Sequence, residues 1–463
     1  MLRVLVFTSC VIAAVCASAL AGEEGAPAPA KPGKYQVGPT REYKTLQDVA
    51  AKLAPGDMVE VDGDAMYPGG VKLTVSGTAE KPITIRGVRV NDKRPLIEGA
   101  DRTVEFRLSN YVVFEGFEVA GGKRNGIYHH AAFITIRDTL VRDCPGQGIL
   151  GADNDSGSCT LQYVEVARCG GGLYTHPIYM STDPVKFPNS VFRMEHCYIH
   201  DGGGGNAVKS RAERNEIYYN CIEAGFYREL EMIGRDSEAG PRPMNSDVVG
   251  NLFIKKSEHP VVRIGHDSKG LGSRGRYRFV NNTFVLSEQA KIAIQAYGKL
   301  DAVEMHNNIF YCMGGGPVQV LNEENAEWLT GKRVVSGSNN WVAKGAEIPK
   351  EWKGTKEGAE PGFVNADKLD FHVALRSPLI GAGTMKPESP EGHEFPNPLF
   401  PPVFEPPMRK IENPGGGQER WDNGKNNRKI DIGAFQCQLL QGLVDHLSDM
   451  VDRMIVKVHK ACL

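Results

Sequence analysis

One short pattern returns many times along the middle of the chain, and this repetition constrains the fold more than any other feature. Between residues 104 and 342, segments in which apolar and polar residues alternate end at Gly, Asn or Asp. The unit returns after roughly 22 to 33 residues, a period typical of solenoids. The segments are VVFEGFEV (112–119), ITIRDTLV (134–141), TLQYVEV (160–166), FRMEHCYI (192–199), IYYNCIE (217–223), DVVGNLFI (247–254), RFVNNTFV (278–285), VEMHNNIFY (303–311) and GSNNWV (337–342).

A second short strand precedes most of these segments. The sequences are GIYHH (126–130), GILGA (148–152), PIYMS (177–181), NAVKS (206–210), ELEMIG (229–234), VVRIG (261–265), KIAIQA (291–296) and PVQVL (317–321). Two or three strands per unit, without helical periodicity between them, predict a coiled parallel solenoid whose coils bury their apolar faces by stacking. We therefore expect an all-β chain, a single-stranded right-handed parallel β-helix with an N-terminal capping helix and a C-terminal helix.

The two ends of the chain differ from the repeat. An early Arg3, an apolar run and small residues up to Ala21 are typical of a secretory signal peptide, which predicts a secreted or periplasmic protein. Helix-period apolar residues from Tyr43 to Leu53 predict the cap, and a similar stripe near the C-terminus predicts a helix that packs or mediates self-association. The predicted divisions are a signal peptide (1–21), a linker (22–42), the β-helix (43–342), wrapping loops with a last strand (343–436) and an amphipathic tail (437–463).

Charge and length narrow the class of partner. The 463 residues carry a formal net charge of −2, so no general basic surface favours nucleic acid or an anionic membrane. The N-terminal apolar run is shorter than the roughly 20 residues that a membrane-spanning helix needs. An acidic partner must therefore be met by a local patch of cations.

Several repeated positions have a structural interpretation. Asparagines at the same place in successive units predict a ladder that supports turns, namely Asn251, Asn282, Asn308 and Asn340. Cys144 matches Cys169, and Cys197 matches Cys221, as stacked core thiols or as disulfides. His196 is expected to pack inside a strand, and the pair His129-His130 to lie on the surface rather than bind metal.

Three motifs resemble a known family. PGDMVEVDG (55–63), PITIRG (82–87) and SNYVVFEGFEV (109–119) are similar to the start of pectate-lyase-like β-helix proteins, nearest to polysaccharide lyase family six, the chondroitinase B and alginate lyase group. The segment 206–237 is more specific, because the family places a catalytic base in a Lys-Ser strand, which Lys209 matches. The resemblance implies that an Arg on the following coil, here Arg235, assists at the leaving oxygen or at the uronate.

The chain departs from this family just before the catalytic strand. Several members carry acidic residues there that hold calcium against the substrate carboxylate, whereas here Asp201 is followed by four glycines and Asn206. We therefore expect no cofactor, since the acidic ligands that calcium would need are missing. The glycine turn itself is expected to let a ligand approach the backbone closely.

The alternation of the strands places further residues beside Lys209. If Val208 and Ser210 point inward, Lys209 and Arg211 point outward, and stacking about 4.8 Å apart brings neighbouring coils into one groove. The predicted catalytic residues are Lys209 and Arg235. The predicted substrate-binding residues are Arg211, Arg263, Tyr179, His176, Glu231 and His266. Positive neighbours such as Arg211 and Arg235 are expected to favour the neutral amine of Lys209.

These residues predict a lyase that cleaves an acidic, uronate-containing polysaccharide by β-elimination, with Arg235 or Arg263 on the carboxylate and Tyr179 or His266 as the acid. A glycoside hydrolase using two of Glu229, Glu231 and Asp236 is an alternative. A uronan epimerase shares the first proton abstraction. A glycan-binding or structural solenoid without catalysis is the remaining alternative.

Overall fold

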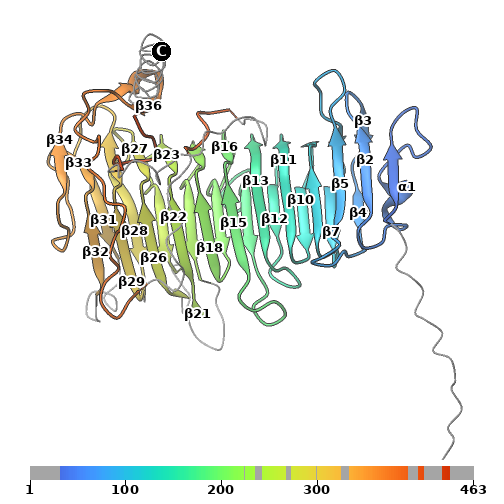
Figure 1. The fold of residues 1–463 in the computed structure, drawn as a ribbon, viewed down its shortest axis with the longest axis horizontal. Helices are drawn as coiled ribbons and strands as arrows, with labels where there is room; N and C mark the ends of the chain where they lie inside the picture. The colour runs from blue at the N-terminus through green and yellow to red at the C-terminus, as the bar shows by residue number, and fades with distance from the viewer. Residues whose placement is uncertain are drawn as a thin grey trace, which may run out of the picture.

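The structure, a computed structural model, describes residues 32–223, 225–234, 242–266, 273–298, 300–324, 333–394, 405–410 and 430–437. The predicted signal peptide, Arg235, Asp236 and all but the first residue of the predicted C-terminal tail lie outside these residues. Figure 1 shows the remainder as one elongated solenoid, with the N-terminal coils at one end and the C-terminal coils at the other.

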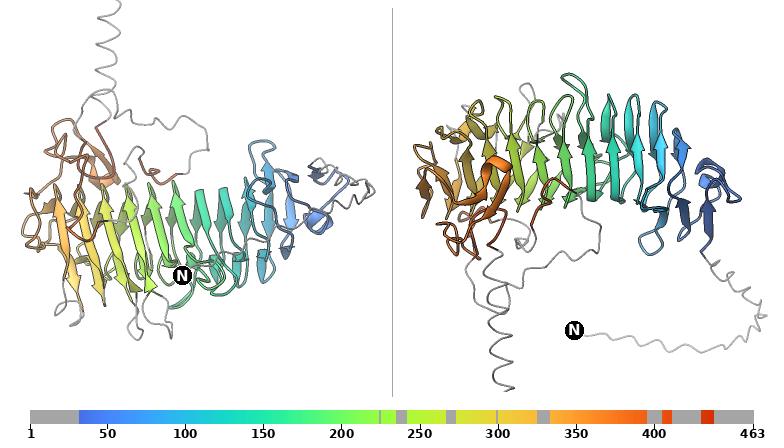
Figure 2. Two further views of the ribbon diagram at one scale, coloured as in Figure 1. Left: turned by 60° about the horizontal axis from the view of Figure 1, so that its bottom comes forward. Right: turned by 90° about the horizontal axis from the view of Figure 1, so that it is seen from above.

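Two long parallel sheets run the length of the described solenoid (Figure 2). The ten-stranded sheet contains β4 (Val71–Leu73), β7 (Arg102–Arg107), β10 (Asn125–His130), β12 (Gln147–Gly151), β14 (Ile178–Ser181), β17 (Val208–Arg211), β20 (Leu230–Ile233), β24 (Val262–Gly265), β28 (Ile292–Tyr297) and β31 (Gln319–Glu323).

The larger sheet has 22 strands within the described residues and bends along its length. They are β1 (Lys34–Val37), β2 (Met58–Asp62), β3 (Met66–Pro68), β5 (Ile83–Val88), β6 (Leu96–Glu98), β8 (Val112–Glu115), β9 (Glu118–Ala120), β11 (Ile134–Arg142), β13 (Cys159–Ala167), β15 (Val191–Glu195), β16 (Tyr198–His200), β18 (Arg214–Tyr218), β19 (Cys221–Glu223), β22 (Asn245–Val249), β23 (Leu252–Lys255), β26 (Arg276–Val280), β27 (Thr283–Leu286), β29 (Ala302–His306), β30 (Ile309–Cys312), β32 (Val335–Ser338), β33 (Trp341–Ala343) and β34 (Lys356–Gly358).

Two small sheets and two short helices complete the described elements. They are β21 (Arg242–Pro243) with β25 (Ser273–Arg274), β35 (Phe363–Asn365) with β36 (Asp370–Val373), the α-helix α1 (Gln47–Ala50) and the 3-10 helix η1 (Ala366–Lys368). The prediction of a parallel β-helix is confirmed. The N-terminal cap is smaller than predicted, because only one turn of the segment from Tyr43 to Leu53 is helical.

Most of the predicted long segments are two strands rather than one. A residue with positive φ bends the chain between them, as at Gly116 (φ 82°), His196 (φ 55°) and Gly250 (φ 70°). The alternation still holds on each side of the bend, and the inward residues form one continuous core along the solenoid. Each coil therefore turns at the bend without interrupting this core.

The predicted asparagine ladder is confirmed, and the structure adds Asn220 at its start. Each side chain accepts from the preceding coil and donates to a carbonyl, as when Asn251 Nδ2 donates to Asn282 Oδ1 at 2.9 Å and to Ile217 O at 2.8 Å. The left-handed bend itself belongs to the residue before each ladder asparagine, for example Asn281 (φ 53°) before Asn282. The ladder therefore ties the coils together while its neighbours make the turn.

Two predicted boundaries differ from the structure. Lys34–Val37, assigned to the linker, forms β1 and pairs with β2. The β-helix continues past residue 342, because β34 pairs with β33. The predicted last strand within 343–436 has counterparts in β34 and in the pair of β35 and β36. IDIGAF (430–435) packs on the turn edge, where Asn281 Nδ2 donates to Asp431 O at 2.9 Å and to Gly433 O at 3.0 Å.

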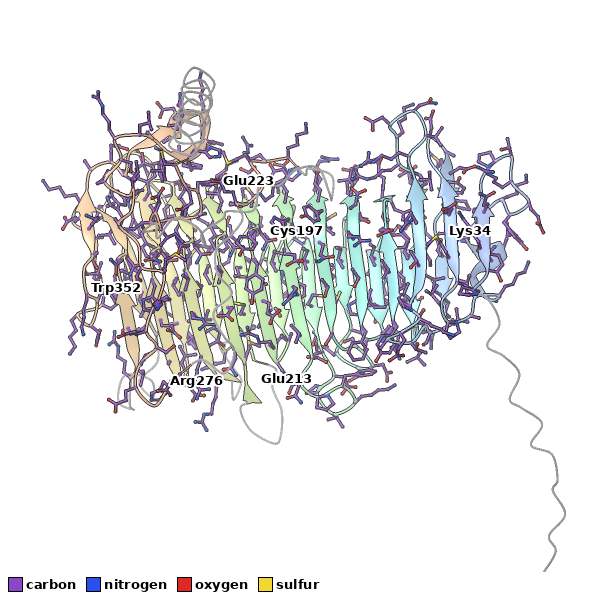
Figure 3. All side chains as sticks on the ribbon, viewed as in Figure 1. Lys34, Cys197, Glu213, Glu223, Arg276 and Trp352 are labelled. Atoms are coloured by element: carbon purple, nitrogen blue, oxygen red, sulfur yellow. The ribbon has the colours of Figure 1, made fainter. Side chains whose placement is uncertain are left out.

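Side chains fill the interior from end to end (Figure 3), and Trp352 packs on Phe310 with ring centroids 5.8 Å apart. Seven cysteines of the described residues are buried free thiols, so the alternative of stacked thiols holds for Cys144 with Cys169. The predicted match of Cys197 with Cys221 is wrong, because strand register pairs Cys221 with Tyr198. His196 is packed as predicted, between the rings of Tyr163 and Tyr219. The surface prediction for His129 is wrong, because its side chain is fully buried.

Candidate functional site

The ten-stranded sheet carries one unbroken column of outward-pointing residues, which we call the outer column. Strand register pairs Tyr179 with Lys209, Lys209 with Glu231, and Glu231 with Arg263. The column in full is Lys72, Glu105, Tyr128, Leu150, Tyr179, Lys209, Glu231, Arg263, Gln295 and Asn322. Val208 and Ser210 are fully buried on either side of Lys209, as alternation predicts.

Two cations from neighbouring strands and one from the turn before β20 converge on Glu231. Its carboxylate lies 3.3 Å from Lys209 Nζ, 3.5 Å from Arg263 Nη1 and 3.9 Å from Arg228 Nη1. Glu231 is buried, and the Lys209 and Arg263 side chains are only 13% and 11% exposed. Partial burial strengthens these electrostatic interactions relative to those on an open surface.

Polar and aromatic side chains hold this cluster in place. Asn206 Nδ2 donates to Glu231 Oε2 at 2.7 Å, and the Asn206 backbone N–H donates to His176 Nδ1 at 2.8 Å. His176 meets the ring of Tyr179 edge-on at 5.5 Å, and Lys209 Nζ lies 5.6 Å from the centre of that ring. Burial, followed by the charge of Lys209, lowers the pKa of His176 to about 4. His176 is therefore a neutral support for the cluster rather than a cation.

The remaining predicted residues lie beside the column or outside the described part. Arg211 follows Lys209 on β17, and its Nη1 donates to Gly234 O at 2.9 Å. His266 follows β24; its carbonyl accepts from Arg263 Nη2 at 3.1 Å and its ring meets Tyr297 at 4.8 Å. Arg235 lies outside the described residues, so its role stays a prediction.

The surroundings of Lys209 differ from the expectation in one respect. Its nearest charged partner among the described residues is the carboxylate of Glu231, not a second cation. The ammonium form is thus one half of an ion pair in this arrangement. A lysine base needs the neutral amine, so the proton of Lys209 must leave before the residue can act.

Sequence reasoning missed Arg228 and Gln295. Arg228 precedes β20 and donates from Nη2 to Gln295 Oε1 at 3.0 Å, which links it across the column. Alternation could not identify Arg228, because it lies in the turn before the strand. Its spacing of three residues from Glu231 was the available signal, since a turn can bring such a pair together.

A buried ion pair fixes the turn that carries Arg228. Lys255 Nζ lies 3.1 Å from Glu229 Oε2, and both side chains are fully buried. Lys255 also donates to Gly225 O at 3.3 Å and to Tyr227 O, while Glu229 Oε1 accepts from Gly225 N at 3.1 Å. Burial raises the pKa of Glu229 to about 7. Glu229 is therefore an internal residue and cannot act as a surface carboxylate.

The four-glycine turn has a packing explanation. A Cβ at Gly203 would lie 2.5 Å from Gly170 O, and one at Gly204 would lie 2.3 Å from Gly172 O. Glycine is needed because the turn of the preceding coil, residues 170–172, stacks directly on this backbone. Packing alone explains these glycines, so their presence does not indicate that a ligand approaches the turn.

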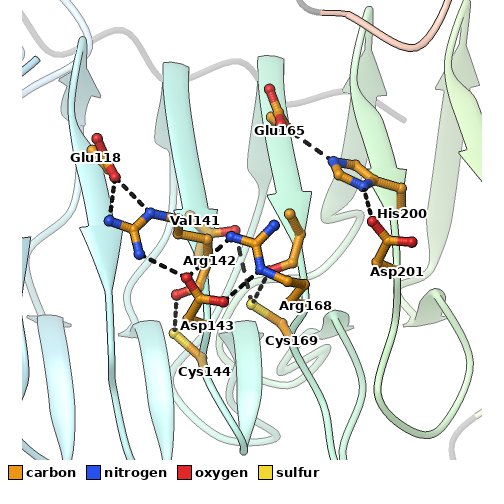
Figure 4. Close-up of polar contacts among 11 residues, drawn as sticks. Glu118, Val141, Arg142, Asp143, Cys144, Glu165, Arg168, Cys169, His200 and Asp201 are labelled. Carbon is orange, nitrogen blue, oxygen red and sulfur yellow. Dashed lines mark hydrogen bonds and ion pairs between the residues drawn. The ribbon is translucent and has the colours of Figure 1, made fainter. Parts of the chain in front are cut away.

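A second charged cluster lies on the larger sheet, at the ends of β9, β11, β13 and β16 (Figure 4). Arg142 contacts Glu118 at 2.5 Å and Asp143 at 2.7 Å, and Arg168 contacts Asp143 at 2.6 Å. His200 lies between Glu165 and Asp201 at 3.2 and 2.8 Å. Every cation here has a carboxylate, which is the arrangement of a structural ladder.

No group of three or more His, Cys, Asp or Glu among the described residues is arranged to hold a metal ion. The helices in that part of the chain are also too short to cross a membrane. The prediction that no cofactor is used is not tested by either observation.

No family model matches the chain, and no curated protein matches it. Solved structures that resemble it include the pectate lyase Pel9A, at 12% identity and a TM-score of 0.47, covering 88% of this chain and 97% of that one. The family PL6 alginate lyase AlyGC has 10% identity and a TM-score of 0.41, covering 80% and 60%. The A-module of the Azotobacter vinelandii mannuronan C-5 epimerase AlgE4 has 11% identity and a TM-score of 0.43, covering 68% and 94%. At this identity the likeness concerns the fold and not the activity.

Proposed function

We propose that this chain is a secreted β-helix protein that acts on an acidic polysaccharide, and that its reaction is β-elimination at a uronate residue. The observation that carries the proposal is the convergence of Lys209, Arg228 and Arg263 on the one carboxylate of Glu231. A carboxylate from a ligand would compete with Glu231 for the same three cations. The column that carries them runs along a repeat fold, which suits an extended polymer.

The roles follow from the contacts. Arg228 and Arg263 hold the substrate carboxylate and make the adjacent C5 proton more acidic. Lys209 passes its own proton to Glu231, 3.3 Å away, and then takes the C5 proton. The C5–H electron pair forms the C4=C5 double bond, the bond from C4 to the glycosidic oxygen breaks, and that oxygen takes a proton from Tyr179.

A glycan-binding protein without catalysis is the second candidate. The ion pair between Lys209 and Glu231 favours it, because a permanently charged lysine binds an anion but removes no proton. A hydrolase has less support, since Glu229 is buried with Lys255 and cannot act beside Glu231. An epimerase shares the first proton transfer, then returns a proton to C5 without breaking the chain.

The experiment is an assay of ultraviolet absorbance from unsaturated uronate with pectate, alginate and chondroitin or dermatan sulfate, each with and without a chelator. We expect wild-type turnover on one polymer and a loss of about a hundredfold or more in Lys209→Ala, as for removal of a general base. The control is Lys81→Ala, an exposed lysine before β5. Full activity in Lys209→Ala would refute the mechanism. Polymer binding without an absorbance change would exclude β-elimination and leave the binding protein, the epimerase and the hydrolase as candidates.

A further inference from the structure

A cavity of about 370 Å³ lies on the same sheet, near its N-terminal end. Its walls come from β4, the start of β7 and the turn before β10. The lining residues are Gly70, Val71, Lys72, Ala100, Asp101, Arg102, Glu105 and Arg124. The volume falls within the range of small-molecule sites, and nothing in the proposed reaction uses it.

Three cations and two carboxylates make up the charged part of the lining. Arg102 already has two partners: its Nη1 lies 3.1 Å from Glu105 Oε1, and its guanidinium lies 3.9 Å from the ring centre of Tyr128. Lys72 and Arg124 are exposed and make no ion pair with any residue that the structure describes. These two side chains can turn toward an anion without giving up an existing partner.

The outer column connects this cavity to the cluster around Glu231. Lys72 and Glu105 belong to the column, and Tyr128, Leu150 and Tyr179 follow in register before Lys209. Five strand steps separate β7 from β20, the strand of Glu231, which is about 24 Å at the usual strand spacing. The Tyr128 ring is buried beneath Arg102, so Leu150 and Tyr179 provide the apolar contacts between the two charged regions, and such surfaces suit the faces of sugar rings.

We propose that this cavity is a second anion-binding subsite for the same polysaccharide, holding a carboxylate or sulfate that lies about five sugar residues from the one at Glu231, at one sugar per strand spacing. The inference rests on the proposed function, because it assumes an acidic polymer. A second subsite also predicts that affinity depends on the length of the oligosaccharide. Short oligosaccharides reach only one of the two regions, whereas longer ones engage both and gain affinity by linkage.

The test measures binding, not turnover. Calorimetry with alginate and oligogalacturonate fragments of two and of eight residues is compared for the wild type, Arg263→Ala and the double variant Lys72→Gln/Arg124→Gln. We expect the double variant to lose about tenfold in affinity for the octamer and nothing for the dimer, as two modest ionic contacts would give. The double variant Lys81→Gln/Lys353→Gln removes two exposed charges elsewhere and serves as the matched control.

Equal losses for both lengths, or no loss for the octamer, would overturn the second subsite while leaving the first intact. Octamer affinity that falls equally in the control would also overturn it, since only general charge would then matter. Absence of binding to the wild type at either length would instead remove the proposed function together with this inference. Binding by the wild type therefore distinguishes the two failures: it is retained if only the second subsite is wrong, and it is absent if the proposed function is wrong.

Discussion

Two clusters of charge on the same solenoid are built in different ways. On the larger sheet, Arg142 contacts Glu118 and Asp143, and Arg168 contacts Asp143, so cations and carboxylates alternate from coil to coil. In the outer column, by contrast, three cations from the described residues converge on Glu231. Alternating charge stabilises the stack by itself, whereas convergence on one carboxylate leaves a place where another anion can compete.

The pKa values of two histidines differ between the two clusters in the same way. Burial lowers the pKa of His200, but hydrogen bonds to Glu165 and Asp201 outweigh it and raise the pKa above the ordinary value. The pKa of His176, in contrast, falls to about 4 through burial and the charge of Lys209. One histidine is held among carboxylates and the other beside a cation.

The largest effect on stability is expected from removing one half of the buried ion pair of Lys255 and Glu229, which supports the outer column. We expect Glu229→Ala to destabilise the fold by about 3–5 kcal/mol, because it leaves Lys255 charged and buried without its carboxylate. Chemical denaturation measures the loss. The double variant Glu229→Leu/Lys255→Met should recover most of it, and a double variant as unstable as the single one would contradict the explanation.

Removal of the Glu231 carboxylate tests whether the three cations around it are available to another anion. Glu231→Gln should raise the affinity for an acidic oligosaccharide about tenfold, since the ligand no longer competes with an internal carboxylate for the three cations. Calorimetry checks this value. Glu118→Gln on the larger sheet is the matched control and should leave the affinity unchanged; equal gains in both variants would mean that only net charge matters.

Much of this architecture is predictable from the sequence, because alternation determines which side chains point outward. Tyr179, Lys209, Glu231 and Arg263 were assigned to one column on that basis, and strand register confirms it. The ladder asparagines followed from their recurrence. In each case the position of a residue within its own strand or turn determines where its side chain points, because alternate residues of a strand point to opposite faces.

Turns and buried partners were not predictable in the same way. Arg228 lies in a turn, where alternation has no meaning, and Lys255 reaches Glu229 only because two coils stack. The glycines at 203 and 204 have the composition of a ligand-binding turn, but the contact that requires them comes from the coil below. Such features depend on register between coils of unequal length, which one sequence does not specify.

The two histidines should change the stability of the fold with pH in opposite directions. His176 binds its proton less readily when folded, so its contribution is complete above the unfolded pKa of about 6.5 and is lost as pH falls toward 4, amounting to about 3 kcal/mol. The contribution of His200 is complete below about pH 6.5 and is lost as pH rises through its raised pKa. NMR titration of labelled histidines, assigned with His176→Gln and His200→Gln, checks both directions. Equal pKa values would contradict the difference between the clusters.

The smallest effect is expected within the alternating ladder. Asp143 is 40% exposed and contacts both Arg142 and Arg168, which hold its pKa at about 2. Water screens such surface pairs, so Asp143→Asn should cost less than about 1 kcal/mol of unfolding free energy, and less still at high salt. Denaturation at low and high ionic strength measures this. A loss comparable to that of Glu229→Ala would mean that the ladder, and not the buried pair, carries the stability of these coils.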